Sequence, residues 1–195
     1  MTSSPFSAIL FDCDGVLVDS EPITHRVFRS MLVDLGWDIS EEECLQRFVG
    51  KSFPEESQII HRHTGHWIDD AWIEVFRDRR DAALAADLAP IPGAVHAVSA
   101  VAAAMGDRFA CVSSADRRKI EMQLGIAGLD SLFGRRVFSG MEVKHSKPAP
   151  DVYLAAAAAL GVDPTTTAVV EDSVSGVLAG VAAGATVFGF APLDR

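Results

Sequence analysis

Two aspartates, Asp12 and Asp14, stand two positions apart directly after the apolar run at residues 8–11. This run is typical of a buried strand, and because strand side chains alternate with period two, we expect both carboxylates on one face. Gly15 then allows the backbone to turn sharply. Two carboxylates about 4 Å apart repel by about 4 kcal/mol at an effective dielectric constant of about 20, so they need a proton or a cation. One aspartate could therefore act as a nucleophile and the other as a general acid and base.

A hydroxyl and an ammonium group follow later predicted strands. Ser114 comes after the apolar residues 109–112, where its hydroxyl could bind a phosphate oxygen or cap the next helix. Lys147 lies in the segment SKPAPD at 146–151, whose prolines stiffen the backbone around it. In a chain of net charge −10, an immobilised lysine is a candidate cation for a phosphate group.

A second acidic pair, Glu171 and Asp172, follows the apolar residues 167–170. Because the carboxyl ends of parallel strands meet at one sheet edge, this pair is expected beside Asp12 and Asp14. Clustered carboxylate oxygens suit Mg²⁺, which prefers hard oxygen ligands. The sequence therefore predicts a magnesium site.

The elements that position these groups alternate between strands and helices after Pro90, which predicts an α/β fold with a doubly wound parallel sheet. The strands are predicted at 6–12, 109–112, 137–138, 167–170 and 186–190, and the helices at 93–105, 116–124, 150–160 and 174–183.

Residues 19–89 contain no convincing strand and have helical periodicity, first at Ile23, Val27, Met31 and Leu35. Further helices are predicted at 40–49, 54–64 and 69–86. We therefore predict two domains, an α/β core of residues 1–18 and 90–195 and a helical insertion of residues 19–89.

The composition excludes several classes of protein. Hydrophobic residues make up 49% of the 195-residue chain, which argues against disorder. The acidic charge disfavours nucleic-acid binding, and no run is long and apolar enough for a membrane span. The three cysteines favour a reducing compartment, and Cys13 is interpreted as a buried small residue. With no signal peptide recognised at the start of the chain, the cytoplasm is the expected location.

The segment FDCDGVLVDSE at 11–21 resembles the first motif of the haloacid dehalogenase-like hydrolases, closest to the branch of sugar-phosphate phosphatases and β-phosphoglucomutase. The segments at 111–114, 146–151 and 169–176 are similar to the second, third and fourth motifs. The resemblance implies a Rossmann-like core with an α-helical cap. It also implies a Mg²⁺-dependent phosphatase that acts on a small phosphorylated sugar or sugar acid through an aspartyl-phosphate intermediate.

The same resemblance implies a role for each motif residue. Asp12 is the nucleophile, and Asp14 is the acid and base. Ser114 and Lys147 bind the phosphate. The metal is bound by Asp12, Asp172 and the backbone carbonyl of Asp14, and Glu171 is either a further ligand or a partner of the ligands.

Two other functions stay open at this stage. A β-phosphoglucomutase resembles this chain, but Thr24 occupies the position of the mutase histidine, and Val49 and Phe53 replace its lysine and arginine. A binding or regulatory protein on the same scaffold is the second alternative. Mg²⁺-dependent release of phosphate would separate an enzyme from such a protein.

The helical insertion contains weaker signals. Lys51 and Arg47 are candidate substrate contacts, with Arg77 a further one, although a solvated surface explains each of them. His61, His63 and His66 could suggest zinc, but a polar loop between helices also accounts for them. The segment Gly50-Lys51-Ser52 lacks the first glycine and the preceding strand of a nucleotide-binding loop.

Overall fold

The computed structural model describes residues 5–48 and 53–191, and the side chains of residues 53 and 54 are outside the description. The chain divides into two compact units, which we call the core unit (Met1–Asp19 and Leu88–Arg195) and the helical unit (Ser20–Asp87). Among the described residues, no helix has both the length and the apolar character needed to cross a membrane.

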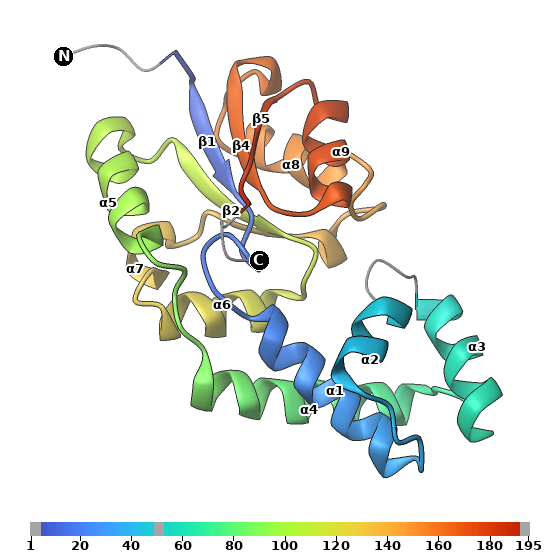
Figure 1. Cartoon of the computed structure of the whole chain (residues 1–195). Helices are drawn as coiled ribbons and strands as arrows, with labels where there is room; N and C mark the ends of the chain where they lie inside the picture. Colours follow the sequence, from blue (N-terminus) through green and yellow to red (C-terminus); the bar gives the residue numbers. More distant parts are fainter. Residues whose placement is uncertain (1–4, 49–52, 192–195) are drawn as a thin grey trace. The chain divides into compact units, whose positions relative to one another are not determined.

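The core unit contains a parallel sheet of five strands in the order β3-β2-β1-β4-β5 (Figure 1). The strands are β1 (Ala8–Phe11), β2 (Phe109–Ser113), β3 (Val137–Ser139), β4 (Thr167–Glu171) and β5 (Thr186–Gly189). On one side of β1, β2 pairs with β1 and β3 pairs with β2. The chain then returns to the centre of the sheet, where β4 pairs with the other side of β1. The strand order thus reverses between β1 and β4, where open α/β sheets form their binding crevice.

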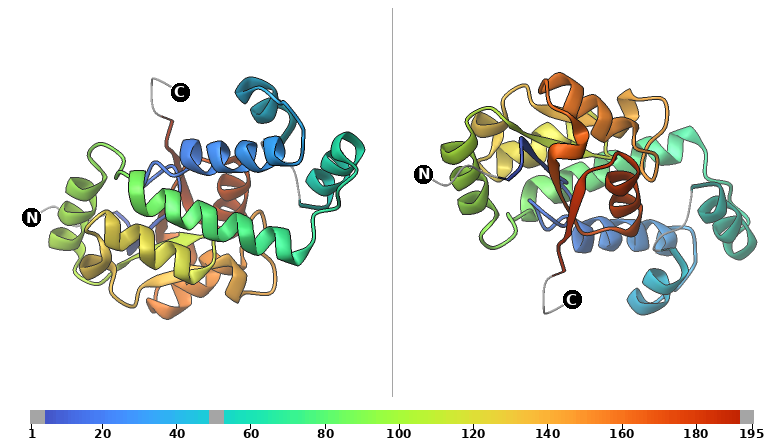
Figure 2. Two further views of the ribbon diagram at one scale, coloured as in Figure 1. Left: turned by 90° about the horizontal axis from the view of Figure 1, so that it is seen from below. Right: turned by 90° about the horizontal axis from the view of Figure 1, so that it is seen from above.

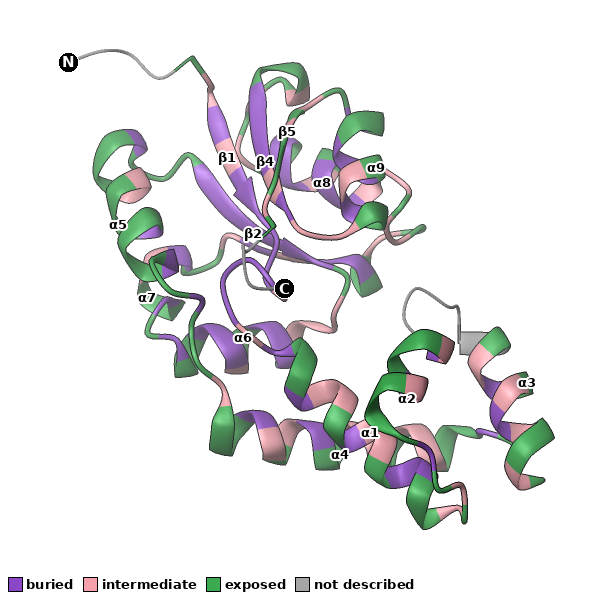
Figure 3. Cartoon of the chain, viewed as in Figure 1, coloured by how far each residue is buried: buried purple, intermediate pink, exposed green. Residues whose placement is uncertain are grey.

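Helices cover both faces of this sheet, and their apolar residues form two separate cores. Phe11, Phe109 and Cys111 pack with residues of α5 (Ala94–Met105), α6 (Arg117–Ile126) and α7 (Asp130–Phe133). Leu10, Ala110 and Val169 pack on the opposite face with α8 (Asp151–Ala159) and α9 (Val174–Ala182). Figure 3 shows the central strands β1, β2 and β4 largely buried, as expected of a doubly wound fold, whereas the edge strand β5 is mostly exposed. The predicted fold class is confirmed.

Strand ends differ from the predicted ones in a way that matters for the site. β1 is shorter than predicted and ends at Phe11, so strand alternation does not orient Asp12 and Asp14. β2 and β4 each continue one residue further, to Ser113 and Glu171, because both residues still pair with a neighbouring strand. Both side chains are consequently buried. The short helix α7 was not predicted, because four residues carry little periodicity.

The helical unit consists of α1 (Glu21–Asp34), α2 (Glu41–Phe48), α3 (Phe53–Thr64) and α4 (Asp70–Asp87). Both views in Figure 2 show α1 beside α4. Of the residues predicted from periodicity, Ile23, Val27 and Met31 are buried in α1, whereas Leu35 follows the end of the helix and is only partly buried. Ser40 accepts a hydrogen bond from the Glu43 backbone N–H at 3.1 Å and so caps α2. A cluster that includes Leu32, Ile39 and Ile60 gives the unit its own apolar core.

Candidate active site

A buried ion triad lies at the carboxyl edge of the sheet. The Lys147 ammonium nitrogen Nζ is 2.6 Å from Asp12 Oδ1, 2.6 Å from Glu171 Oε1 and 3.1 Å from the Val112 carbonyl oxygen. Asp12 follows β1, Glu171 ends β4, and Lys147 precedes a cis peptide bond to Pro148 before α8. The Lys147 side chain is 3% exposed, so solvent barely screens these contacts.

The electrostatics of the triad reflect an excess of negative charge. Burial raises the pKa of Asp12 to about 8, Lys147 opposes that shift, and the carboxylates of Glu171 and Asp14 add to it. Burial lowers the pKa of Lys147, but Asp12 and Glu171 outweigh it, so the net direction is upward. Lys147 therefore stays charged, while Asp12 needs a further cation to be fully ionised near neutral pH.

Glu171 has its carboxylate oxygens occupied by protein donors. Besides Lys147, Oε1 accepts a hydrogen bond from the Tyr153 hydroxyl at 2.8 Å. Oε2 accepts from the Ser173 backbone N–H at 3.1 Å and the Ser173 hydroxyl at 3.0 Å. A Cβ atom on Gly176 would lie 1.7 Å from Oε1, so only glycine fits beside this carboxylate. The arrangement holds Glu171 rigidly against Lys147.

Asp172 approaches the backbone at Gly15, the turn that follows the two aspartates. A Cβ atom on Gly15 would lie only 1.9 Å from Asp172 Oδ2, and Gly15 has a φ angle of +76°. One carboxylate oxygen from each of Asp12, Glu171 and Asp172 lies within 4.8 Å of the others. These hard oxygen ligands suit Mg²⁺, whose charge would favour the ionised form of Asp12 that burial disfavours.

Asp14 contacts a second set of partners, which the sequence did not reveal. Its Oδ1 accepts hydrogen bonds from Lys119 Nζ at 2.7 Å and Gln123 Nε2 at 2.8 Å. Its Oδ2 is 3.4 Å from the Ser113 hydroxyl. Lys119 and Gln123 are buried and stand four residues apart on α6, on the same helix face. The four-residue spacing could have indicated that both side chains lie on one helix face. It was not used, because a lysine on a helix usually points into solvent.

The two serines at the end of β2, Ser113 and Ser114, differ sharply in their exposure to solvent. Ser114, the predicted phosphate ligand, is exposed. Ser113 is buried, and its hydroxyl also accepts a hydrogen bond from the Ala115 backbone N–H at 3.1 Å. Cys13 is buried, in agreement with its interpretation as a small core residue.

The residues singled out in the helical unit have partners of their own. Arg47 pairs with Glu43 at 2.8 Å, and Lys51 lies outside the described residues. His61 stacks on Trp67 at 3.9 Å between ring centroids, and His63 stacks on Trp37 at 4.0 Å. Within the described part of the chain, the geometric signature of a metal site is confined to Asp12, Glu171 and Asp172.

Comparison with known proteins places this geometry in a family. The model of the family described as haloacid dehalogenase-like hydrolase matches residues 6–184, nearly the whole chain. The chain belongs to the haloacid dehalogenase-like hydrolases, which confirms the resemblance of its motifs.

Several of the relatives are named as phosphatases. The chain is 32% identical over 188 residues to 6-phosphogluconate phosphatase of Escherichia coli, covering 96% of this chain and 83% of that protein. It is also 32% identical to hexitol phosphatase B of Escherichia coli, over 90% of this chain and 79% of the other. A crystal structure of a HAD family hydrolase from Deinococcus radiodurans, with bound phosphate and sodium, aligns with a TM-score of 0.78 and 36% identity. That alignment covers 96% of this chain and 81% of the other.

Proposed function

We propose that this protein is a Mg²⁺-dependent phosphatase that hydrolyses a small phosphorylated sugar or sugar acid through a covalent aspartyl phosphate. One observation carries the proposal: the buried Asp12 carboxylate lies 2.6 Å from Lys147, at a sheet edge that also holds Glu171 and Asp172. Membership of the hydrolase family and the named phosphatase relatives support it.

Asp12 and Asp14 divide the chemistry between them in this proposal. Asp12 attacks the phosphorus atom, the bond to the leaving oxygen breaks, and the phosphoryl group is transferred to Oδ of Asp12. Asp14 gives a proton to the leaving alcohol and later takes one from the water that hydrolyses the aspartyl phosphate. Lys147 neutralises the phosphate and the attacking carboxylate. The exposed Ser114 hydroxyl is available to bind a phosphate oxygen.

The proposed metal ligands are Asp12, Asp172 and the backbone carbonyl of Asp14. When bound, Mg²⁺ supplies charge that stabilises the transferring phosphoryl group and keeps Asp12 ionised. We assign Glu171 to a different task, because its oxygens already accept hydrogen bonds from Lys147, Tyr153 and Ser173. Glu171 holds the ammonium group of Lys147 in place.

The helical insertion, predicted at residues 19–89, is proposed to act as a cap. A cap excludes water during phosphoryl transfer and supplies contacts that select the substrate. Arg47 is a proposed contact within it, and its present pairing with Glu43 is half-exposed and easily exchanged. Lys51, the other proposed contact, lies outside the described residues.

A phosphate-release screen tests the proposal. Purified protein is incubated with phosphorylated metabolites and with a generic aryl phosphate, with Mg²⁺ or with a chelator. We expect release of inorganic phosphate that requires Mg²⁺. Isomerisation of β-glucose 1-phosphate to glucose 6-phosphate without net release would indicate a mutase instead. No turnover of any substrate would favour the binding or regulatory alternative.

A further inference from the structure

Two buried carboxylates of the core unit share the ammonium group of Lys147. Asp12 Oδ1 and Glu171 Oε1 each lie 2.6 Å from Nζ, and the Val112 carbonyl oxygen lies at 3.1 Å. These three acceptors match the three N–H donors of an ammonium group. Because both carboxylates lie at the same distance, the balance between them decides how much of the positive charge supports Asp12, the proposed nucleophile.

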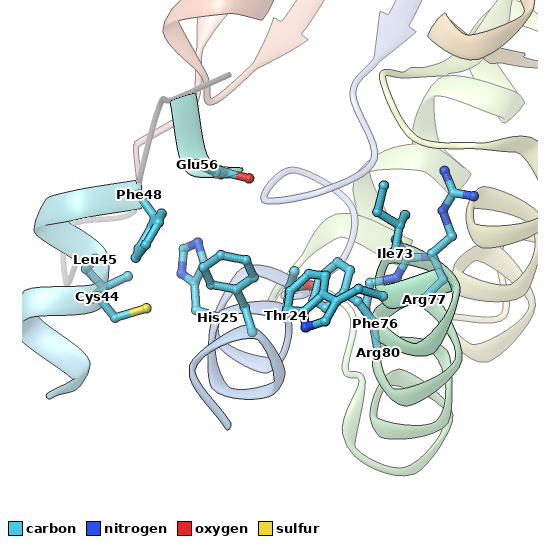
Figure 4. A pocket seen from close by; sticks show the side chains of 12 residues that line it. Thr24, His25, Cys44, Leu45, Phe48, Glu56, Ile73, Phe76, Arg77 and Arg80 are labelled. Carbon is cyan, nitrogen blue, oxygen red and sulfur yellow. The ribbon is translucent and has the colours of Figure 1, made fainter. Parts of the chain in front are cut away.

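The buried cation of the helical unit differs from Lys147 in its geometry. Arg80 lines a pocket of about 340 Å³ (Figure 4), and its Nε and Nη2 both donate to one oxygen, Asp81 Oδ1, at 2.9 and 2.7 Å. The rigid fork of a guanidinium group fixes the direction of such a pair. An ammonium group has no fork and can turn between acceptors, so neighbouring groups must set the position of Lys147.

Tyr153 contacts both members of the Lys147–Glu171 pair. Its hydroxyl donates to Glu171 Oε1 at 2.8 Å, the same oxygen that accepts from Lys147. Lys147 Nζ lies 4.9 Å from the centroid of the Tyr153 ring, within the range of a cation–π contact. A single side chain therefore touches the shared cation and the carboxylate that competes with Asp12 for it.

The packing of Tyr153 keeps its hydroxyl in a fixed place. The residue lies on α8, is 1% exposed and belongs to the apolar core that includes Leu10, Val112 and Val169. Because such a core is close-packed, the ring cannot shift without displacing its neighbours. The hydroxyl is thus a rigid donor for Glu171.

This donor changes the competition for the ammonium group. A hydrogen bond from a neutral hydroxyl stabilises the charge of a carboxylate, so Glu171 depends less on Lys147 for its stabilisation. Ser173 acts in the same direction on the other oxygen, Oε2, through its backbone N–H and its hydroxyl. More of the charge of Lys147 is then left for Asp12.

We propose that Tyr153 is a positioning residue that directs the ammonium group of Lys147 toward Asp12 by stabilising the charge of Glu171. The inference rests on the proposed phosphatase function, and it adds a residue that lies outside the four sequence motifs. Without the hydroxyl, Glu171 draws the ammonium group toward itself, and Asp12 attacks phosphorus with less electrostatic support.

Tyr153→Phe tests the inference, because it keeps the ring and removes the hydroxyl. We expect kcat/KM to fall by about tenfold, since a hydrogen bond to a charged group is lost. The loss should be the same for an aryl phosphate and for a sugar phosphate, because the same nucleophile attacks both. A loss confined to the sugar phosphate would place the effect on protonation of the leaving group and would contradict the inference.

Thr167→Val is the matched control. Thr167 is buried at the opposite end of β4 from Glu171, and its hydroxyl donates to the Pro164 carbonyl at 2.7 Å. The variant also loses one hydrogen bond of a buried hydroxyl, but away from Lys147, so it should keep the wild-type kcat/KM. The same loss of kcat/KM in both variants would show that reduced stability is the cause, and the inference would be wrong.

Nuclear magnetic resonance of ¹⁵N-labelled lysine supplies a readout that does not depend on activity. In the wild-type protein, the ammonium protons of Lys147 are held by three acceptors and should exchange slowly enough to give a signal, which Lys147→Met identifies by its loss. The signal should move in Tyr153→Phe and stay in place in Thr167→Val. Absence of the signal from the wild-type protein would overturn the inference without any need for Tyr153→Phe to fold.

The outcomes separate this inference from the proposed function. If the wild-type protein hydrolyses an aryl phosphate and Tyr153→Phe is equally active, only this inference fails. If the wild-type protein hydrolyses no phosphate ester in the presence of Mg²⁺, the proposed function fails and this inference falls with it.

Discussion

The Lys119 ammonium nitrogen lies 2.7 Å from Oδ1 of Asp14, across 105 positions of sequence. Each of the two aspartates after β1 thus has its own lysine, Lys147 for Asp12 and Lys119 for Asp14. Gln123 shares the same Asp14 oxygen at 2.8 Å. We therefore expect Lys119 and Gln123 to position the Asp14 carboxylate, which is proposed to move the proton.

Replacing Lys119 by Met should lower kcat/KM for a sugar phosphate by about tenfold or more, a fraction of the 10²–10⁴ that a general acid contributes. An aryl phosphate should lose less, because its leaving group departs without protonation. Steady-state kinetics with both substrates measures the difference, and Lys119→Arg should restore part of the activity. Arg118→Met is the control, since Arg118 is exposed on the same helix. Equal losses for both substrates would contradict a role through Asp14.

Asp12→Asn should lower turnover by about 10³-fold or more, because an amide is a poor nucleophile. Asp14→Asn should lower turnover yet still allow phosphate to accumulate on Asp12, since only proton transfer is impaired. Acid quenching followed by mass spectrometry of the peptide that contains residue 12 measures this intermediate. Phosphate found on another residue would show that the nucleophile is misassigned.

Gly15→Ala should weaken Mg²⁺ binding, because the new Cβ atom would lie 1.9 Å from Asp172 Oδ2 and must displace it. The Mg²⁺ concentration for half-maximal activity should rise by about tenfold, which corresponds to about 1.4 kcal/mol of lost binding energy. Gly128→Ala provides the control. Its φ of +69° imposes a similar backbone strain, but nothing lies within 4 Å of the added atom. The same loss in both variants would argue that strain, and not Asp172, is responsible.

Mg²⁺ affinity should depend on pH below about 8, because the ion competes with the proton on Asp12, whose pKa burial raises to about 8. Affinity should rise about tenfold per pH unit up to that value and then level off. Calorimetric titrations with Mg²⁺ from pH 6 to 9 measure this slope, which Asp12→Asn should abolish. A flat pH profile in the wild-type protein would be inconsistent with this coupling.

The same shift has a consequence for stability without metal. The folded protein holds the Asp12 proton more tightly than the unfolded chain, where the pKa is near 3.8. This group therefore stabilises the fold most at low pH, and that contribution is lost as the pH rises from about 4 to 8. Denaturant unfolding in chelator should follow this trend, and Mg²⁺ should offset the loss.

The α/β fold was predictable because apolar runs of strand length alternate with helical periodicity, a pattern that follows from local residue spacing. The boundaries of the strands were harder to predict from the sequence. Ser113 and Glu171 belong to β2 and β4 only because Ser139 and Gly189 pair with them from neighbouring strands. Hydrogen bonds between strands, and not local preference, decide where a strand ends.

Within the site, the sequence determined which residue types lie at the ends of the strands, and so placed Asp12, Glu171 and Asp172 together at one sheet edge. Only the tertiary structure decided which side chains contact the carboxylates at this edge. Packing of α6 and α8 brings Lys119 to Asp14 and Tyr153 to Glu171, over separations of 105 and 18 residues. No periodicity encodes such pairs, because each depends on how a helix face docks on the sheet, which the whole core determines together.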